Sequence, residues 1–119
     1  MSYAGSFAVD VNRRRKLRRI FVRPLAWRDL IQAAEYLEAN ADPGLAERLI
    51  DAFTDELGTL SKMPHIGTLC GFRSDEARNI RRWPITNFER WLIFYDPTGS
   101  RVEVVRLLHG AQDINSILD

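Results

Sequence analysis

Cysteine is nearly absent from this chain of 119 residues: Cys70 is the only one, which excludes an internal disulfide. A secreted scaffold held together by disulfides is therefore excluded too. No apolar run approaches the ~20 residues that a membrane-spanning helix needs. The first ten residues also lack the apolar core of a secretory signal. Together these absences predict a cytoplasmic protein with a free thiol.

Histidine and lysine are scarce as well. His65 and His109 are the only histidines, and they lie far apart without carboxylates at ligand spacing, so a zinc site is not expected. The chain has no phosphate-binding glycine loop and no Gly-x-Ser-x-Gly elbow. We therefore predict no metal and no cofactor.

The length predicts one domain, because two cores of half this size would not hold themselves folded. We place the domain at residues 19–119, after a basic extension at residues 1–18. Six of the seven residues from Arg13 to Arg19 are basic. The extension is predicted to be flexible or helical, with Asn12 as the cap of a short helix. On charge alone, it is either a solvated tail or a nucleic-acid-binding segment.

The net charge of +1 hides an uneven distribution. From Ala26 to Leu60 eight acidic residues face two arginines, a local net charge of −6. The N-terminal segment and the approach to the predicted strands hold most of the arginines. A molecule with one acidic and one basic side suits charged partners better than its total charge suggests.

Two helices are predicted in the first half of the chain, at about 25–40 and from Asp42-Pro43 to about Lys62. Apolar residues recur at helical spacing in both. In the first helix they are Trp27, Leu30, Ile31, Ala34 and Leu37; in the second, Leu45, Ala46, Leu49, Phe53, Leu57 and Leu60. The short link between the helices predicts an antiparallel hairpin.

Four strands are predicted around these helices, at 20–23, 78–85, 91–95 and 102–109. They are short, rich in β-branched and aromatic residues, and bounded by turn residues. Asp96-Pro97-Thr98-Gly99 has the chemistry of a type I turn and should join the last two. The predicted class is α+β in the order β-α-α-β-β-β: a mainly antiparallel four-stranded sheet with the helix hairpin packed on one face.

The last predicted strand is largely apolar on both faces, which indicates a central or covered position. The helix hairpin covers only one face of the sheet, so a partner protein is expected to cover most of the other. Residues 112–118 can add a terminal helical turn or two, with Ile114, Ile117 and Leu118 packing inward.

The order and spacing of several motifs resemble one known family. Arg81-Arg82-Trp83-Pro84-Ile85 is followed by Leu92-Ile93-Phe94-Tyr95, and then by Val102 to Asp113, which contains Arg106-Leu107-Leu108-His109-Gly110-Ala111. Upstream, Met63-Pro64-His65-Ile66-Gly67 resembles a Pro-x-x-Gly link between helix and sheet. Over roughly residues 18–118 the chain is similar to the ParE branch of the RelE/ParE toxin superfamily.

This resemblance implies the toxin of a type II toxin-antitoxin pair, of the kind called plasmid stabilisation proteins. The implied partner is a ParD-like antitoxin whose disordered tail folds on the toxin, and operator DNA would be reached only through that antitoxin. The implied target is DNA gyrase, inhibited by direct binding rather than by catalysis.

Two alternatives stay open. Resemblance to the RelE side would imply a ribosome-dependent mRNA endonuclease, in which arginines stabilise the phosphorane and a histidine or tyrosine moves protons. Its candidate catalytic residues are Arg82, Arg106, His109 and Tyr95. Against it, Lys16 and Lys62 are the only lysines and the chain lacks a tyrosine tail, unlike RelE-type nucleases. The second alternative is an inactive member that acts only in an antitoxin-operator complex.

The candidate residues for antitoxin or target binding are Arg78, Arg81, Arg82, Trp91, Arg106, His109 and Asp113. Each also has a structural reading. The three arginines before Trp83 can protect an edge strand from aggregation. Arg106 can form a partly buried ion pair, His109 can bond a neighbouring loop or Asp113, and Trp91 can be either core or an exposed anchor.

Overall fold

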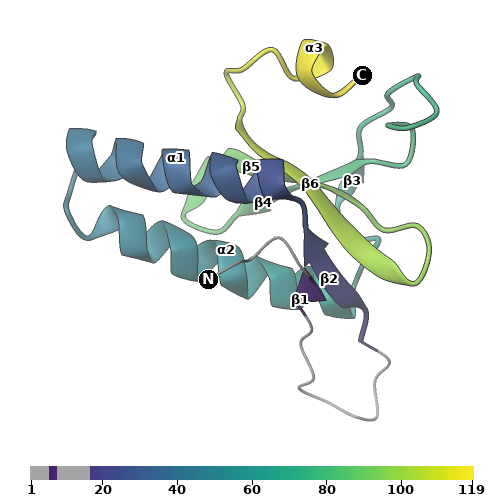
Figure 1. The fold of residues 1–119 in the computed structure, drawn as a ribbon, viewed down its shortest axis with the longest axis horizontal. Coiled ribbons are helices and arrows are strands. Elements are labelled where there is room, and N and C mark those ends of the chain that lie inside the picture. The colour runs from purple at the N-terminus through teal and green to yellow at the C-terminus, as the bar shows by residue number, and fades with distance from the viewer. Residues whose placement is uncertain (1–5, 8–16) are drawn as a thin grey trace.

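The computed structural model describes residues 6–7 and 17–119. Six strands form one sheet in the order β1-β2-β6-β5-β4-β3, and a helix hairpin lies against one of its faces (Figure 1). The strands are β1 (Ser6–Phe7), β2 (Arg19–Val22), β3 (Thr68–Leu69), β4 (Arg81–Ile85), β5 (Phe88–Asp96) and β6 (Arg101–His109). The helices are α1 (Pro24–Asn40), α2 (Leu45–Lys62) and α3 (Ile114–Leu118). Among the strands of the described residues, β2 and β6 are the one parallel pair.

The predicted α+β class and element order are confirmed, but the strand count is wrong. The sheet gains two strands of two residues each, one at either edge. β1 comes from the extension that was predicted to be flexible or helical, and it pairs antiparallel with β2. Such short pairings carry too little alternation to be read from a sequence. The short helix predicted after Asn12 falls mainly on residues 8–16, outside the described residues.

Both helices of the hairpin are confirmed, with two corrections. Ile31 was placed on the apolar face of α1, yet 54% of its surface is exposed. α2 begins at Leu45 rather than at Asp42. The Asp42 carboxylate accepts a hydrogen bond from the Gly44 amide at 3.1 Å, so Asp42 shapes the turn before the helix. No helix among residues 6–7 and 17–119 is long and apolar enough to cross a membrane.

The predicted hairpin between β5 and β6 is also confirmed. The Asp96 carboxylate accepts hydrogen bonds from the Thr98 amide at 2.8 Å and from its hydroxyl. Gly99 has a φ of +79°, a conformation that a residue with a Cβ adopts only under strain. β6 therefore returns beside β5 and lies between β5 and β2, the central position predicted for it.

The main core lies between the helix hairpin and the sheet. Its fully buried side chains include Leu30 of α1, Phe53 of α2, and Ile93 and Leu107 of the two long strands. Burying a side chain of this size contributes roughly 1.5–3 kcal/mol. Trp27 packs against Phe53 with ring centroids 6.1 Å apart, so its expected place at the core is confirmed.

A second core covers the opposite face of the sheet, and this corrects a prediction. That face was expected to stay open for a partner. Instead Phe94 and Leu108 are 1% exposed, packed against Phe72, Ala77 and Ile80. The segment 70–80 and α3 supply this cover, with Ile114 and Leu118 packed inward. The inward position expected for Ile117 is wrong, because 38% of its surface is exposed.

Glu56 joins α2 to the sheet from a buried position. Its carboxylate accepts hydrogen bonds from Trp83 Nε1 at 2.8 Å, from the Thr86 amide at 2.9 Å and from the Thr86 hydroxyl at 2.7 Å. These bonds hold the end of β4 and the following turn on the helix. A buried carboxylate is tolerated here because it accepts three hydrogen bonds.

Replacing Glu56 by alanine tests this contact. The substitution leaves the Trp83 indole and the Thr86 amide without an acceptor, and buried unsatisfied donors cost about 1–3 kcal/mol each. We expect the free energy of unfolding, measured by urea titration, to fall by about 2–4 kcal/mol. Asp55→Ala changes the exposed neighbour on the same helix and should alter it by less than about 0.5 kcal/mol. Equal effects of the two substitutions would contradict this role of Glu56.

Candidate functional site

Arg106 forms an ion pair with Asp29 of α1. Arg106 Nε and Nη2 donate to the two carboxylate oxygens of Asp29 at 2.7 and 2.9 Å. The same carboxylate accepts from the Leu107 amide at 3.0 Å. These hydrogen bonds raise the pKa of the Arg106 guanidinium further above its ordinary value. The partly buried ion pair expected for Arg106 is confirmed, although the sequence did not identify Asp29 as its partner.

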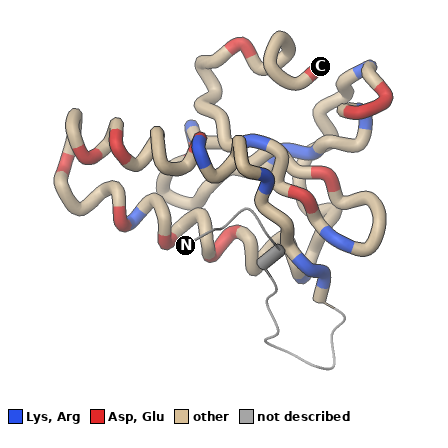
Figure 2. Tube along the Cα trace, in the orientation of Figure 1, with Lys and Arg blue, Asp and Glu red and all other residues tan. Residues whose placement is uncertain are grey.

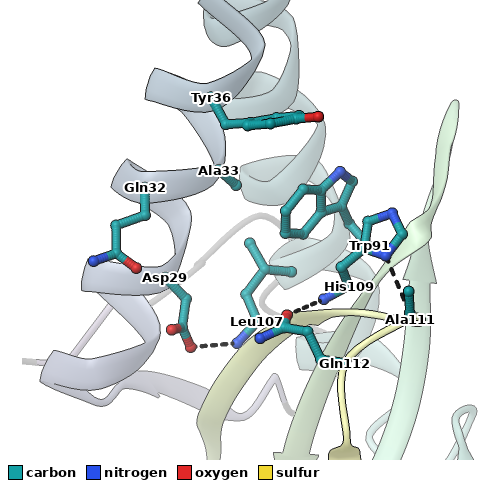
Figure 3. A pocket seen from close by; sticks show the side chains of 9 residues that line it. All are labelled: Asp29, Gln32, Ala33, Tyr36, Trp91, Leu107, His109, Ala111 and Gln112. Atoms are coloured by element: carbon teal, nitrogen blue, oxygen red, sulfur yellow. Dashed lines mark hydrogen bonds between the residues drawn. The ribbon is translucent and has the colours of Figure 1, made fainter. Parts of the chain in front are cut away.

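An aromatic groove of about 490 Å³ lies between α1 and the ends of β5 and β6 (Figure 3). We call it the Trp91 groove. Trp91 and His109 meet edge to face in it, with ring centroids 5.0 Å apart. Tyr36 lies across from them and is 60% exposed, and Asp29 and Gln112 also line the groove. Trp91 is half-buried, and its ring lines the groove. It is not the fully exposed anchor that was one of the two predictions for it.

His109 is held in one orientation by the turn that follows β6. Its Nδ1 accepts a hydrogen bond from the Ala111 amide at 3.1 Å, and its own amide donates to Gln112 Oε1 at 2.7 Å. The expected bond to a neighbouring loop is confirmed. Asp113 does not take part, because its carboxylate accepts from Ser116 at the start of α3.

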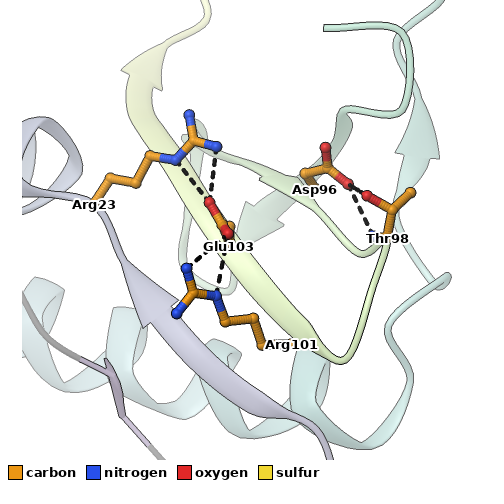
Figure 4. A network of polar contacts seen from close by, with 5 residues as sticks. All are labelled: Arg23, Asp96, Thr98, Arg101 and Glu103. Carbon is orange, nitrogen blue, oxygen red and sulfur yellow. Dashed lines mark hydrogen bonds and ion pairs between the residues drawn. The ribbon is translucent and has the colours of Figure 1, made fainter. Parts of the chain in front are cut away.

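Three charged residues that sequence reasoning missed meet on the second face of the sheet (Figure 4). Glu103 accepts from Arg23 Nη2 at 2.8 Å on one oxygen and pairs with Arg101 Nη2 at 3.1 Å on the other. Arg23, with Arg101, lowers the pKa of the Glu103 carboxyl. The Arg101 guanidinium also lies 4.5 Å from the centroid of the Phe21 ring. The parallel pairing of β2 with β6 brings these residues together, and a sequence gives little signal of that pairing.

The arginines of the β4 region differ from their predicted setting. β4 pairs with β3 as well as β5, so Arg81 and Arg82 do not lie on an edge strand. Arg81 Nη1 donates to the Gly67 carbonyl at 2.8 Å and to the His65 carbonyl at 3.2 Å. Arg78 precedes the strand and lies 4.0 Å from Asp75, both of them exposed. Burial raises the pKa of the Cys70 thiol, and the exposed Arg82 nearby lowers it by a smaller amount.

The Pro-x-x-Gly link has a physical basis at Gly67. The Gly67 amide donates to the Tyr95 hydroxyl at 2.9 Å. A Cβ on Gly67 would lie 2.6 Å from that hydroxyl oxygen and 2.7 Å from the Arg82 carbonyl, closer than real contacts allow. Burial raises the pKa of the Tyr95 hydroxyl, while the Gly67 hydrogen bond lowers it by less.

The structure does not bring the four candidate ribonuclease residues together. Arg82 and Arg106 both pair with Phe94 across the sheet, whereas His109 pairs with Trp91, three residues away along β5. Three residues of strand span about 10 Å. Tyr95 is 0% exposed and belongs to the core on the helix side. No cluster of three potential metal ligands exists within residues 6–7 and 17–119.

The predicted division of charge is visible along the chain. Acidic residues dominate the α1–α2 hairpin, and basic residues gather near the start of β2 and around the sheet (Figure 2). The Trp91 groove opens beside the acidic hairpin, whereas the Glu103 cluster lies on the sheet.

Comparisons with known proteins point to one family. The family profile described as the ParE toxin of the type II toxin-antitoxin system parDE matches residues 20–114. A solved chain of the chromosomal ParDE TA system from P. aeruginosa has a similar fold, with a TM-score of 0.61 over 76% of this chain and 92% of that chain. Their sequences are 13% identical, so this likeness concerns the fold alone. No curated protein matches the chain.

A double-mutant cycle tests the contact between α1 and β6. Asp29→Ala leaves both Arg106 and the Leu107 amide without their acceptor, so this single substitution should cost about 2–3 kcal/mol of unfolding free energy. Combined with Arg106→Ala, the two substitutions should show a coupling energy of about 1–3 kcal/mol in urea titrations. Effects that simply add would mean that the two side chains do not stabilise the fold jointly.

The Glu103 cluster predicts a pH dependence. Because the folded pKa of Glu103 is lowered, its contribution to stability is present above the ordinary glutamate pKa of about 4.3 and is lost as pH falls through the lower folded value. Glu103→Gln should therefore destabilise the protein by about 0.5–1 kcal/mol at pH 7, a modest value because all three groups are partly exposed. The difference should shrink towards zero near pH 3.

The exposed Glu38 provides the control for that measurement. Glu38→Gln should leave the unfolding free energy within about 0.5 kcal/mol of the parent at both pH values. A deficit in Glu103→Gln that persists unchanged at pH 3 would show that lost packing, not lost charge, is its cause.

Proposed function

Because the chain belongs to the ParE toxin family of type II toxin-antitoxin systems, we propose that it inhibits DNA gyrase by direct binding. We propose further that a ParD-type antitoxin neutralises it in a hetero-oligomeric complex in the cytoplasm. In this proposal the toxin reaches operator DNA only through the antitoxin.

The placement of the candidate ribonuclease residues supports binding over RNA cleavage. A tyrosine that moves protons must reach the substrate. The Tyr95 hydroxyl is buried and accepts a hydrogen bond from the Gly67 amide. An arginine that stabilises a phosphorane works best when its whole guanidinium faces it, but Arg106 Nε and Nη2 are bound to Asp29, the residue that closes the edge of β6. Both side chains support the fold, which leaves surface recognition as the role best supported for this molecule.

Two groups of the predicted binding residues stay available for partners. Trp91 and His109 border the Trp91 groove, whose aromatic surfaces suit an anchoring side chain of a protein partner. Arg78 and Arg82 are exposed near the second core and can contact acidic groups. We propose these two regions as contact areas for the antitoxin or the target, while Arg81 and Asp113 position local structure.

Expression without the antitoxin tests the proposal most directly. We expect growth arrest, and purified toxin should block gyrase supercoiling and cause cleaved DNA to accumulate. Addition of the ParD-type antitoxin from the same operon should restore supercoiling, because the antitoxin would occupy the binding surface. Unchanged supercoiling without cleaved DNA would contradict gyrase as the target.

Ribosome-dependent mRNA cleavage provides the opposing measurement. Cleavage by the parent protein that disappears in Arg82→Ala or His109→Ala would establish the ribonuclease alternative instead. Normal growth without the antitoxin would show that this chain is not toxic and acts, if at all, in the complex with antitoxin and operator.

A further inference from the structure

A second groove, of about 390 Å³, lies on the opposite side of the Arg106–Asp29 pair from the Trp91 groove. It is bounded by the start of α1, the segment 76–80, β6 and α3, and we call it the Leu25 groove. Ala77, Ile80, Val105 and Leu118 supply apolar surface. None of the residues predicted to bind partners, except Arg106, lines it.

Two large apolar side chains on this groove remain in water. Leu25 is 51% exposed and Ile117 is 38% exposed, and both line the groove. They come from α1 and α3, which are distant in sequence, and they border the apolar surface supplied by Val105 and Ile80. Such a surface gains free energy when another apolar side chain removes it from water.

The groove also offers hydrogen-bond donors of one kind. Arg23 and Arg106 line it, and each binds its carboxylate through Nε and Nη2. The Nη1 group of each makes no hydrogen bond to the described part of the chain and can donate to a further carboxylate. Glu76 is the one acidic residue among the described residues that line the groove; it is exposed and would repel an acidic ligand at the rim.

The two grooves lie along one side of α1. Leu25 lines one and Tyr36 the other, eleven residues apart, which is about 16 Å along a helix. The Arg106–Asp29 pair lies between them, with Arg106 in the lining of the Leu25 groove and Asp29 in that of the Trp91 groove. A site of this length suits a folded or extended peptide segment better than a small molecule.

We infer that the Leu25 groove is the docking site of an antitoxin segment that carries an aliphatic side chain beside a carboxylate. The aliphatic side chain packs between Leu25 and Ile117, and the carboxylate accepts from Nη1 of Arg23 and Arg106. This inference rests on the proposed function for the identity of the partner. The choice of groove rests on apolar exposure and arginine donors, which the residues of the Trp91 groove do not combine.

A matched pair of substitutions on α1 tests the apolar part. Leu25 and Ile31 are exposed to nearly the same extent, 51% and 54%, but only Leu25 lines the groove. We expect Leu25→Ser to weaken binding of the purified ParD-type antitoxin of the same operon by about tenfold, as truncation of an anchor does. Ile31→Ser should change the dissociation constant by less than about twofold. Calorimetric titration measures both, and thermal unfolding checks that each variant is folded.

A substitution of Glu76 tests the proposed carboxylate contact, and here binding should become tighter instead of weaker. Glu76→Gln removes the acidic group at the rim and should tighten antitoxin binding by about two- to fivefold at low salt, with a smaller gain at high salt. Glu38→Gln removes an exposed acid from α1 away from the groove and should have no such effect. Tightening by both substitutions alike would show general charge attraction and would overturn the assigned carboxylate contact.

The outcomes separate this inference from the proposed function. If the antitoxin binds the parent protein and Leu25→Ser and Ile31→Ser are equivalent, the groove assignment is wrong while the proposed function stands. Self-association of the toxin that Leu25→Ser abolishes would assign the groove to a second copy and also overturn it. If the parent protein does not bind the antitoxin, both the partner and the groove assignment fail.

Discussion

The outer edge of β6 is the constraint on which the rest of the structure depends. β6 has nine residues, but β2 pairs only with its first four, from Arg101 to Val104. Beyond that point the edge needs other acceptors, because buried backbone amides must be paired. Asp29 supplies one to Leu107, and Gln112 supplies one to His109. α1 therefore contacts the outer edge of β6 through Asp29. The two grooves lie on either side of the Arg106–Asp29 ion pair.

The second core changes how the sheet relates to a partner. Segment 70–80 and α3 cover Phe94 and Leu108, and the Asp119 carboxylate holds the two together by accepting from the amides of Arg73 and Ser74. Those hydrogen bonds lower the pKa of the Asp119 side chain. A toxin must remain folded after its antitoxin is gone, and a sheet that is covered on both faces by its own chain meets that requirement. In the proposed complex the antitoxin fills grooves and does not have to cover a whole face of the sheet.

Sequence reasoning identified the elements and failed mainly on contacts between them. Helical spacing located the hairpin, and turn residues located the return at Asp96, because both signals are local. The sequence could not identify the partner of Arg106, because many carboxylates on the predicted helices could have formed the ion pair. The parallel pairing of β2 with β6 is what places Asp29 beside Arg106. The Glu103 cluster was missed for the same reason. The closed second face was misjudged because segment 70–80 has no period that marks it as core.

Two of the candidate catalytic residues, Tyr95 and Arg106, have structural roles in the folded protein. The Tyr95 hydroxyl accepts a hydrogen bond from the Gly67 amide, and Gly67 can approach it because it has no Cβ. Arg106 neutralises the acid that closes β6. A chain of this size has few buried polar groups available, and those that fix its backbone cannot also move in a reaction. The exposed apolar side chains of Leu25 and Tyr36 fix no backbone, so the proposed surface recognition can use them without loosening the fold.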